Sequence, residues 1–153
     1  MFIVTDNADE LLAEAAAFDA ELHAGLASLT EETCEEAAAH ARAVGQFQDH
    51  SGNLRRGIVG FLVQKTDTGA QGQIASVMPY SSLVEDGTPP HDIRARGTAL
   101  RWEGANGVRF AKVVHHPGSR PYPFMGPAYL KAQALLPAKG EALLAKLISK
   151  HSG

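Results

Sequence analysis

An apolar stripe at helical spacing runs through the first third of this 153-residue chain and constrains the fold more than any other feature of the sequence. Its first part consists of Leu11, Ala15, Phe18, Leu22, Leu26 and Leu29. Asn7 and Glu10 stand at the spacing of a capping box just before the stripe. The sequence therefore predicts an amphipathic helix that begins at this point.

The stripe continues through Thr33, Ala37, His40 and Val44, which leaves two interpretations open. Gly25 and the polar residues at 28–32 are compatible with the end of one helix and the cap of a second. A single helix over residues 8–44 would instead be about 55 Å long, against a diameter of roughly 40 Å for a compact domain of this size. Such a helix must protrude or pack on a neighbouring subunit.

Acidic and basic residues are divided along the chain. Residues 1–41 contain ten Asp and Glu and no Lys or Arg, whereas the remainder carries all 14 Lys and Arg against seven acids. In an oligomer, the acidic segment, including Glu32, Glu35 and Glu36, would contact the basic body of a neighbouring subunit. Alternatively, these carboxylates face a channel and repel DNA phosphates. A solvated helix face is the third interpretation.

We predict one α+β domain over residues 1–153. It has a long N-terminal helix or two helices, a largely antiparallel sheet of about four to five strands with a long hairpin, and a C-terminal helix. Its segments are the acidic helical residues 1–45, the sheet over 54–114, a Pro/Gly loop over 115–123 and the final helix over 124–150. Pro127 suits the first turn of that helix, and Pro137 is expected to kink or divide it.

Within the sheet, strand-like runs at 58–63 and 73–78 flank a turn at Thr68, Gly69 and Gly72, which predicts the long hairpin. A short helical turn is expected over 80–86, closed by Gly87. Three further strands are expected at 91–95, 99–103 and 107–114. A turn at Asn106 and Gly107 joins the last two of these strands.

Composition excludes several classes of protein. No apolar run approaches the roughly 18 residues that a membrane span needs, and the first residues lack the basic and apolar regions of a signal peptide. The single cysteine, Cys34, cannot form an internal disulfide, so we expect folding in the reducing cytoplasm. Glutamates flank Cys34 on both sides, and we expect them to raise its pKa and make it a poor nucleophile.

The histidines give a weak signal for a metal site. His91, Asp92, His115 and His116 are the nearest approach to a ligand cluster, but adjacent side chains on an extended segment point to opposite faces. The sequence holds no HExxH, GxSxG, Walker or GxGxxG motif. It therefore predicts neither an enzyme nor a cofactor, and hydrogen-bonded or solvated histidines are the simpler interpretation.

A nucleic-acid-binding adaptor is the alternative function that the sequence leaves open. It would depend on arginines spread among the predicted strands, with Trp102 and Phe110 as candidate stacking residues. These arginines are Arg55, Arg56, Arg94, Arg96, Arg101 and Arg109. The formal net charge of the whole chain, −3, is unlike that of a strongly basic nucleic-acid-binding domain.

Five segments in the middle of the chain carry a resemblance to a known family. They are residues 50–58 (HSGNLRRGI), 80–88 (YSSLVEDGT), 89–94 (PPHDIR), 99–102 (ALRW) and 116–125 (HPGSRPYPFM). In their order and spacing they resemble the tail-completion or head–tail joining proteins of long-tailed double-stranded DNA phages, which are also described as minor tail components.

The resemblance implies a structural virion protein of the phage neck, folded in the host cytoplasm, with no enzymatic activity and no cofactor. It implies a homo-oligomeric ring, with six subunits as in phage tails, at the junction of head and tail. The partners would be neighbouring neck and tail proteins, such as the connector or adaptor and the tail terminator or tube. Genomic DNA would pass through the ring without specific binding, and no membrane is involved.

The resemblance also assigns structural roles to residues of these segments, in which glycines allow positive φ and apolar side chains pack the loop ends onto the sheet and final helix. The residues are Gly52, Leu54, Arg55, Tyr80, Val84, Glu85, Gly87, Thr88, Pro117, Gly118, Pro123 and Phe124. The loop from Pro117 to Pro123 has the composition of a contact site, because it is stiffened by prolines and carries an Arg and a Tyr. The predicted assembly residues are His116, Arg120, Pro121 and Tyr122, together with Glu32, Glu35 and Glu36.

Overall fold

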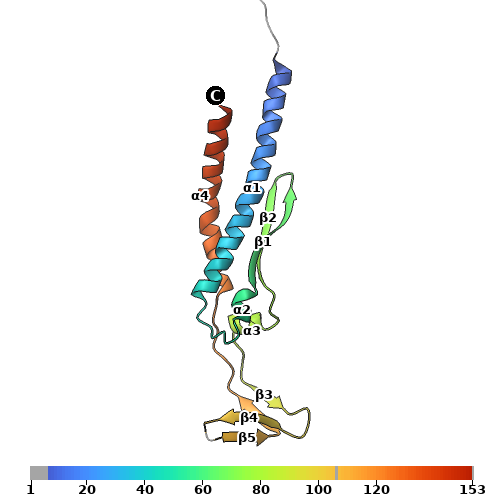
Figure 1. Ribbon diagram of the computed structural model, residues 1–153, viewed down its shortest axis with the longest axis vertical. Coiled ribbons are helices and arrows are strands. Elements are labelled where there is room, and N and C mark those ends of the chain that lie inside the picture. The colour runs from blue at the N-terminus through green and yellow to red at the C-terminus, as the bar shows by residue number, and fades with distance from the viewer. Residues whose placement is uncertain (1–6, 106, 153) are drawn as a thin grey trace, which may run out of the picture. The chain divides into compact units, whose positions relative to one another are not determined.

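The computed structural model describes residues 7–105 and 107–152 and confirms the predicted α+β fold class, with a long N-terminal helix, an antiparallel hairpin and a C-terminal helix (Figure 1). The chain is organised as two compact units. Residues 7–78 and 124–152 form what we call the helical unit, and residues 79–123 form the strand unit. Asn106, half of the predicted turn pair, lies outside the described residues.

The N-terminal stripe forms one helix, α1 (Ala8–Val44), rather than two. Within it, the hydroxyls of Thr30 and Thr33 donate to the carbonyls of Leu26 and Leu29, both at 2.7 Å, so these residues are accommodated inside the helix. Asn7 is the N-cap residue, but its side chain makes no capping hydrogen bond, so the predicted capping box does not form.

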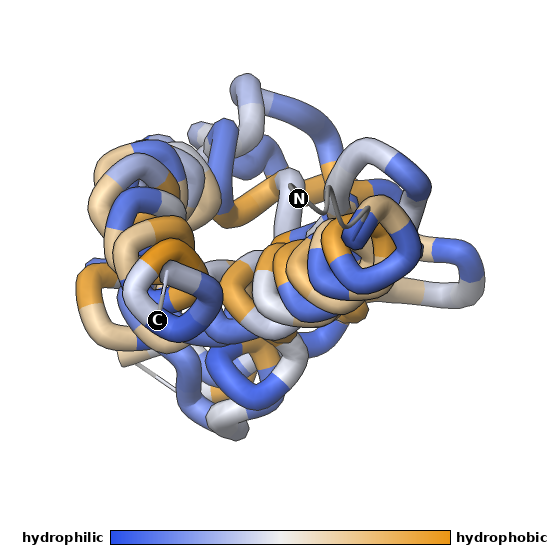
Figure 2. Tube along the Cα trace, turned by 90° about the horizontal axis from the view of Figure 1, so that it is seen from above, coloured by the Kyte–Doolittle hydropathy of each residue, from blue (hydrophilic) through white to orange (hydrophobic). Residues whose placement is uncertain are grey.

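The C-terminal helix, α4 (Met125–His151), lies beside α1, as the views along and across the two helices show (Figures 1 and 2). A Cβ atom on Gly25 of α1 would lie 2.5 Å from Leu143 Cδ1 of α4, so this glycine allows the close approach of the two helices. Pro127 lies in the first turn of α4, as predicted. Pro137 does not divide the helix, which continues through it without the hydrogen bond that a backbone N–H at this position would make.

The predicted long hairpin is confirmed as β1 (Ile58–Thr66) and β2 (Gly69–Ser76), which pair antiparallel from Ile58 opposite Ser76 to Thr66 opposite Gly69. Gly72, predicted in the turn, lies within β2 opposite Leu62. The hairpin packs on α1 very closely at Gly60, where a Cβ atom would collide with the backbone carbonyl of Cys34.

The core of the helical unit forms where α1 packs on the hairpin, the short helix α2 (Asn53–Arg56) and α4. Its buried apolar residues are Ala27, Leu29, Cys34, Ala37, Ala38, Ala41, Phe47, Leu54, Ile58, Phe124, Ala128 and Leu147. Most of the buried residues on α1 have small side chains. They allow the hairpin and α4 to approach the helix closely.

The strand unit contains α3 (Ser81–Glu85), β3 (His91–Arg94), β4 (Leu100–Gly104), β5 (Gly107–Ala111) and β6 (Val113–His116). The predicted strand over 107–114 is two strands, β5 and β6, which pair with β4 and β3 respectively. Over residues 7–105 and 107–152, the strands thus form three two-stranded antiparallel ladders, β1–β2, β3–β6 and β4–β5, instead of one sheet.

The predicted 115–123 loop begins later than expected, because His115 and His116 belong to β6. Cross-strand side chains favour this extension of the ladder. The His115 ring lies 2.5 Å from the Asp92 carboxylate, and the rings of His91 and His116 lie 5.0 Å apart.

Candidate assembly site

The loop that carries most of the predicted assembly residues is fastened to the end of the α3 turn by backbone hydrogen bonds. Thr88 and Ser119 form a two-way bridge in which each N–H donates to the other's carbonyl at 3.0 Å. Their hydroxyls are 3.1 Å apart, and the Tyr122 N–H donates to the Val84 carbonyl at 2.9 Å. We call these contacts between residues 84–88 and 118–122 the clasp.

Two glycines make the clasp possible. Gly87 has φ of 73° and Gly118 has φ of 87°, a region that side chains other than glycine rarely adopt. A Cβ atom on Gly87 would collide with the Ser119 carbonyl, and one on Gly118 would collide with the Thr88 carbonyl. The glycines of two segments that are distant in sequence therefore serve one contact.

The clasped loop presents a cation and an aromatic ring together. The guanidinium of Arg120 lies 4.7 Å from the centre of the Tyr122 ring, and Arg120 and Pro121 are exposed. His116, half-buried, accepts a hydrogen bond from the Gly118 N–H at 3.0 Å. The structure therefore places Arg120, Pro121 and Tyr122 in one loop whose backbone is held by hydrogen bonds, with His116 at the end of β6 just before it. Pro117 and Pro123, at the two ends of the loop, are exposed.

The three glutamates predicted at the interface lie on α1, and two of them pair within their own chain. Lys139 of α4 lies 3.1 Å from the Glu36 carboxylate and 3.9 Å from that of Glu32, and Lys131 lies 3.9 Å from Glu36. Glu35 is exposed on the same stretch, which lines an open hollow with Arg42 and Gly60. The acidic segment thus has lysines of the C-terminal helix as partners.

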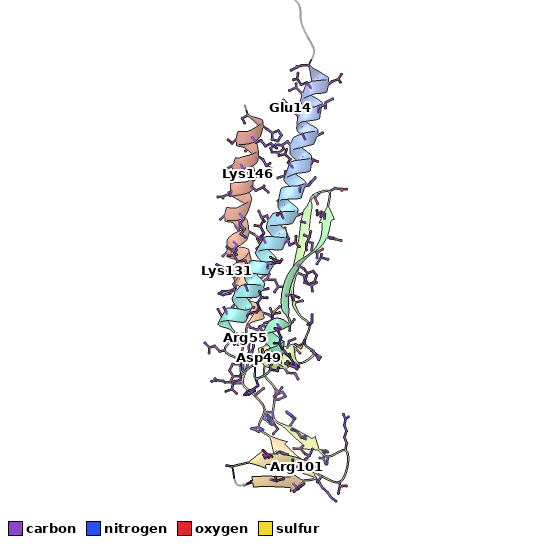
Figure 3. All side chains as sticks on the ribbon, in the orientation of Figure 1. Glu14, Asp49, Arg55, Arg101, Lys131 and Lys146 are labelled. Atoms are coloured by element: carbon purple, nitrogen blue, oxygen red, sulfur yellow. The ribbon has the colours of Figure 1, made fainter. Side chains whose placement is uncertain are left out.

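Residues of the first segment of the resemblance, 50–58, contact the C-terminal end of α1. The Arg55 guanidinium donates to the carbonyl of Arg42 and, at 2.7 Å, to that of Gly45, and lies 4.6 Å from the Phe47 ring. The Asp49 carboxylate accepts the Arg55 backbone N–H at 2.8 Å (Figure 3). Arginine here satisfies carbonyls that have no helical partner.

Phe124, from the last segment of the resemblance, packs at the same place. Its ring lies 5.1 Å from that of Phe47 in an edge-to-face arrangement, and both side chains are buried, as is Leu54. Gly52, with φ of 70°, precedes α2 as its N-cap. Phe47 therefore contacts both Arg55 and Phe124 within the helical unit, and we call these three residues the Arg55 junction.

The remaining predicted structural residues lie in the α3 turn. Tyr80 is its N-cap residue and is exposed, contrary to the expected packing role, because a unit of two two-stranded ladders and one short helix offers no interior for a large ring. Val84 and Glu85 are half-buried. Val84 contributes its carbonyl to the clasp, so its backbone has the most clearly defined role.

Among the described residues, no group of three His, Cys, Asp or Glu side chains is placed to hold a metal ion. The predicted division of the histidine cluster is confirmed by the register, which places His91 opposite His116 and Asp92 opposite His115. Burial raises the pKa of the Cys34 thiol. The predicted direction is correct, but its cause is burial among apolar neighbours and not the adjacent carboxylates.

Sequence reasoning missed the partners of the acidic segment on α4. Besides the pairs of Lys131 and Lys139, Lys150 contacts Glu21 at 2.5 Å, and the His151 ring packs edge-on against Phe18 at 5.5 Å. The hydrogen bond from Lys150 and the charges of Lys150 and His151 lower the pKa of Glu21. The lysines spaced along the final helix are the sequence feature from which this pairing could have been predicted.

Comparison with known proteins adds no relative: no family model, no curated protein and no solved structure matches the chain. Over the residues that the structure describes, no helix is both long enough and apolar enough to span a membrane.

Proposed function

We propose that this protein is a structural component of the neck of a long-tailed double-stranded DNA phage. It assembles as a ring, of six subunits by the resemblance, at the junction of head and tail. The ring completes the tail and joins it to the capsid connector, while DNA passes through. The protein acts by its shape and contacts, without a cofactor or a chemical reaction.

The observation that carries this proposal is the role of the residues behind the resemblance. Gly87, Thr88 and Gly118 form the clasp, and Arg55 and Phe124 belong to the Arg55 junction. These residues fix the path of the backbone, and none has an acid, base or nucleophile role in the geometry. A structural ring component requires residues of this kind, which hold the backbone in a defined shape.

Exposed apolar residues support a role in assembly. Large hydrophobic side chains are exposed on the described parts of both units, and exposed apolar surface commonly marks contacts with other proteins. They include Leu11, Leu12, Phe61, Val63, Leu83, Ile93, Val108, Phe110, Tyr129 and Ile148.

The test is removal of the gene from the phage genome that encodes it, followed by electron microscopy of the lysate. We expect DNA-filled heads and separate tails, and infectious particles when the wild-type gene is supplied in trans. Joined particles in normal number without the protein would contradict the proposal. A gene for the Gly140→Ala variant, supplied in the same way, is the control, because a Cβ atom at Gly140 meets no other atom within 4 Å.

A nucleic-acid-binding adaptor is the second candidate. Residues 91–116 carry five Arg and Lys against two acids, and Trp102 and Phe110 are exposed beside them. This candidate predicts DNA binding by the purified protein that weakens steeply with salt. The neck proposal predicts no such binding at physiological salt.

A further inference from the structure

The N-terminal end of α1 extends past the last contacts that we find between α1 and α4. Phe18 packs on His151 and Glu21 pairs with Lys150, both at the end of α4. All residues of 8–17 are exposed, and at 1.5 Å per residue this stretch adds about 15 Å of helix. Figures 1 and 3 show it projecting beyond the end of α4. We call residues 8–17 the acidic end of α1.

The acidic end has two kinds of side chain. Leu11 and Leu12, 56% and 68% exposed, continue the apolar stripe that packs on α4 further along the helix. Glu10 and Glu14, four residues apart and therefore on one face, flank Leu11. No ion pair involves Glu10 or Glu14 within the described chain, and residues 8–17 contain no Lys or Arg. This surface is suited to an apolar and basic partner.

The strand unit offers such a partner surface. The register of β4 and β5 places Arg101 opposite Phe110 and Glu103 opposite Val108, and because paired residues share a face, these four lie on one side of the ladder. Phe110 is 66% exposed, and Val108 is exposed as well. We call Arg101, Glu103, Val108 and Phe110 the Phe110 face.

The Phe110 face lacks the covering that a two-stranded ladder needs. Such ladders are marginally stable in water unless a further strand or a helix packs on them. No side chain of the strand unit is buried in the described residues 79–105 and 107–123. The strand segment from His91 to His116 carries an excess of three positive charges, with five Arg and Lys against two acids.

We propose that the acidic end of α1 of one copy packs on the Phe110 face of the next copy. Leu11 and Leu12 cover Phe110 and Val108, and Glu10 and Glu14 approach Arg101. The contact joins two different surfaces, so it repeats head to tail, and it forms a ring when the rotation between successive copies closes. This inference rests on the proposed function, since it supplies the contact between neighbouring subunits.

Charge favours the Phe110 face as the partner of the acidic end over an apolar groove on the helical unit. The groove between α1, β2 and α4, lined by Thr30, Ile74, Tyr129 and Leu136 among others, contains no charged residue. It would leave Glu10 and Glu14 without a partner of opposite charge. The Phe110 face has the apolar area of Phe110 and Val108, and Arg101 beside it as a cationic partner. Glu103 balances Arg101 on the face itself, so the net positive charge comes from the segment around it, residues 91–116.

The test uses two variants of the full chain and their mixture, followed by analytical ultracentrifugation and negative-stain imaging. Leu11→Asp with Leu12→Asp changes the acidic end, and Phe110→Asp changes the Phe110 face. Leu130→Asp with Leu144→Asp, two exposed leucines on α4, is the matched control. Circular dichroism establishes that each variant has the helix content of the wild type.

We expect the wild type and the control to form rings, and each test variant alone to associate at least tenfold more weakly. An equimolar mixture of the two variants should form dimers that do not grow. In each dimer, the intact acidic end of the Phe110→Asp copy binds the intact face of the other copy. These heterodimers also show that both variants are folded at the surface that remains unchanged.

Four results would overturn the inference. The wild-type chain could stay monomeric at millimolar concentration, or the variants could assemble like the wild type. The folded mixture could lack heterodimers, or Phe110→Asp could lose DNA binding while its assembly is unchanged. Rings formed equally well by the wild type and both variants would refute this contact alone and leave the neck proposal standing. The gene-removal experiment tests that proposal separately.

Discussion

The two units of the chain are built on different physical principles. The helical unit buries apolar side chains from two long helices and a hairpin, with Phe124, Leu54 and Ile58 fully enclosed. Residues 79–123 contain no buried side chain among those described, and they are organised by short ladders, glycines and cross-strand pairs. The helical unit therefore has a core of its own, whereas we propose that the strand unit is completed by contact with another protein.

Removing one phenylalanine from each unit gives the strongest test of this difference between the units. Phe124→Ala deletes a ring with 0% exposure and should lower the free energy of unfolding by about 3–5 kcal/mol. Phe110→Ala deletes a ring that is mostly exposed and should change it by no more than about 0.5–1 kcal/mol. Urea denaturation monitored by circular dichroism measures both, and similar losses in the two variants would contradict the division.

A second prediction concerns the close approach of α1 and β1. Gly60→Ala should lower the free energy of unfolding by about 1–3 kcal/mol, because the added methyl group meets the Cys34 carbonyl and the hairpin must move away from the helix. Gly140→Ala, in an open position on α4, should raise it by up to about 1 kcal/mol. If Gly60→Ala left the free energy of unfolding unchanged, the hairpin would not be packed tightly on α1.

The clasp gives a third prediction, confined to the strand unit. Gly87→Ala should destabilise the clasp by about 1–3 kcal/mol through its positive φ and its contact with the Ser119 carbonyl. Hydrogen exchange at the Thr88 and Ser119 amides should accelerate, while exchange in α1 stays unchanged. Gly97→Ala, where the added methyl meets nothing within 4 Å, is the control. Unchanged exchange at both amides in Gly87→Ala would contradict the role of the glycine.

The clasped loop gives a fourth prediction that separates stability from assembly. Arg120→Ala with Tyr122→Ala removes a cation–aromatic pair whose arginine is exposed and whose tyrosine is half-buried, and it should reduce the free energy of unfolding by no more than about 1 kcal/mol. The same variant should reduce the joining of heads to tails in the complementation assay. A lower melting temperature by many degrees would instead assign the two side chains to the fold, and normal joining would remove the loop from the interface.

The smallest expected effect is at the ion pair of Glu21. Lys150 and His151 lower its pKa below the ordinary value of 4.5, so the pair stabilises the fold above that pH and the contribution is lost as the pH falls through the lowered pKa. Glu21→Gln should therefore lower the melting temperature slightly at pH 7, and this effect should disappear as the pH falls below the lowered pKa of Glu21. Glu31→Gln, on the same helix, is the control, and a pH-independent effect of Glu21→Gln would argue against the pair.

Periodicity predicted the helical unit well because its elements are long and strongly patterned. The stripe from Leu11 to Val44 predicted a helix, and the strand runs predicted the hairpin. Whether α1 was one helix or two depended on contacts that local sequence does not contain, since Gly25 is accommodated by Leu143 of α4. Gly72 resembled a turn residue, yet it lies in a strand where Cys34 of α1 leaves no room for a side chain.

The strand unit and the candidate site were harder to predict for the same reason. The run over residues 107–114 looked like one strand, but the chain bends at Lys112 and its two halves pair with different partners. The sequence left the partners of the acidic segment open between a neighbouring subunit, a channel and solvent, and it gave no sign that Glu32 and Glu36 lie beside Lys139 of the same chain. Charge counts along the chain do not show which opposite charges the fold brings together.

The central claim, that this protein is a ring of the phage neck, is tested most directly by locating it in the intact virion. Gold-labelled antibodies against the protein should mark phage particles at the junction of head and tail. Quantitative mass spectrometry of the purified particles should give six copies for each particle. Absence of the protein from purified particles, or labelling at the capsid surface or tail tip, would contradict the account.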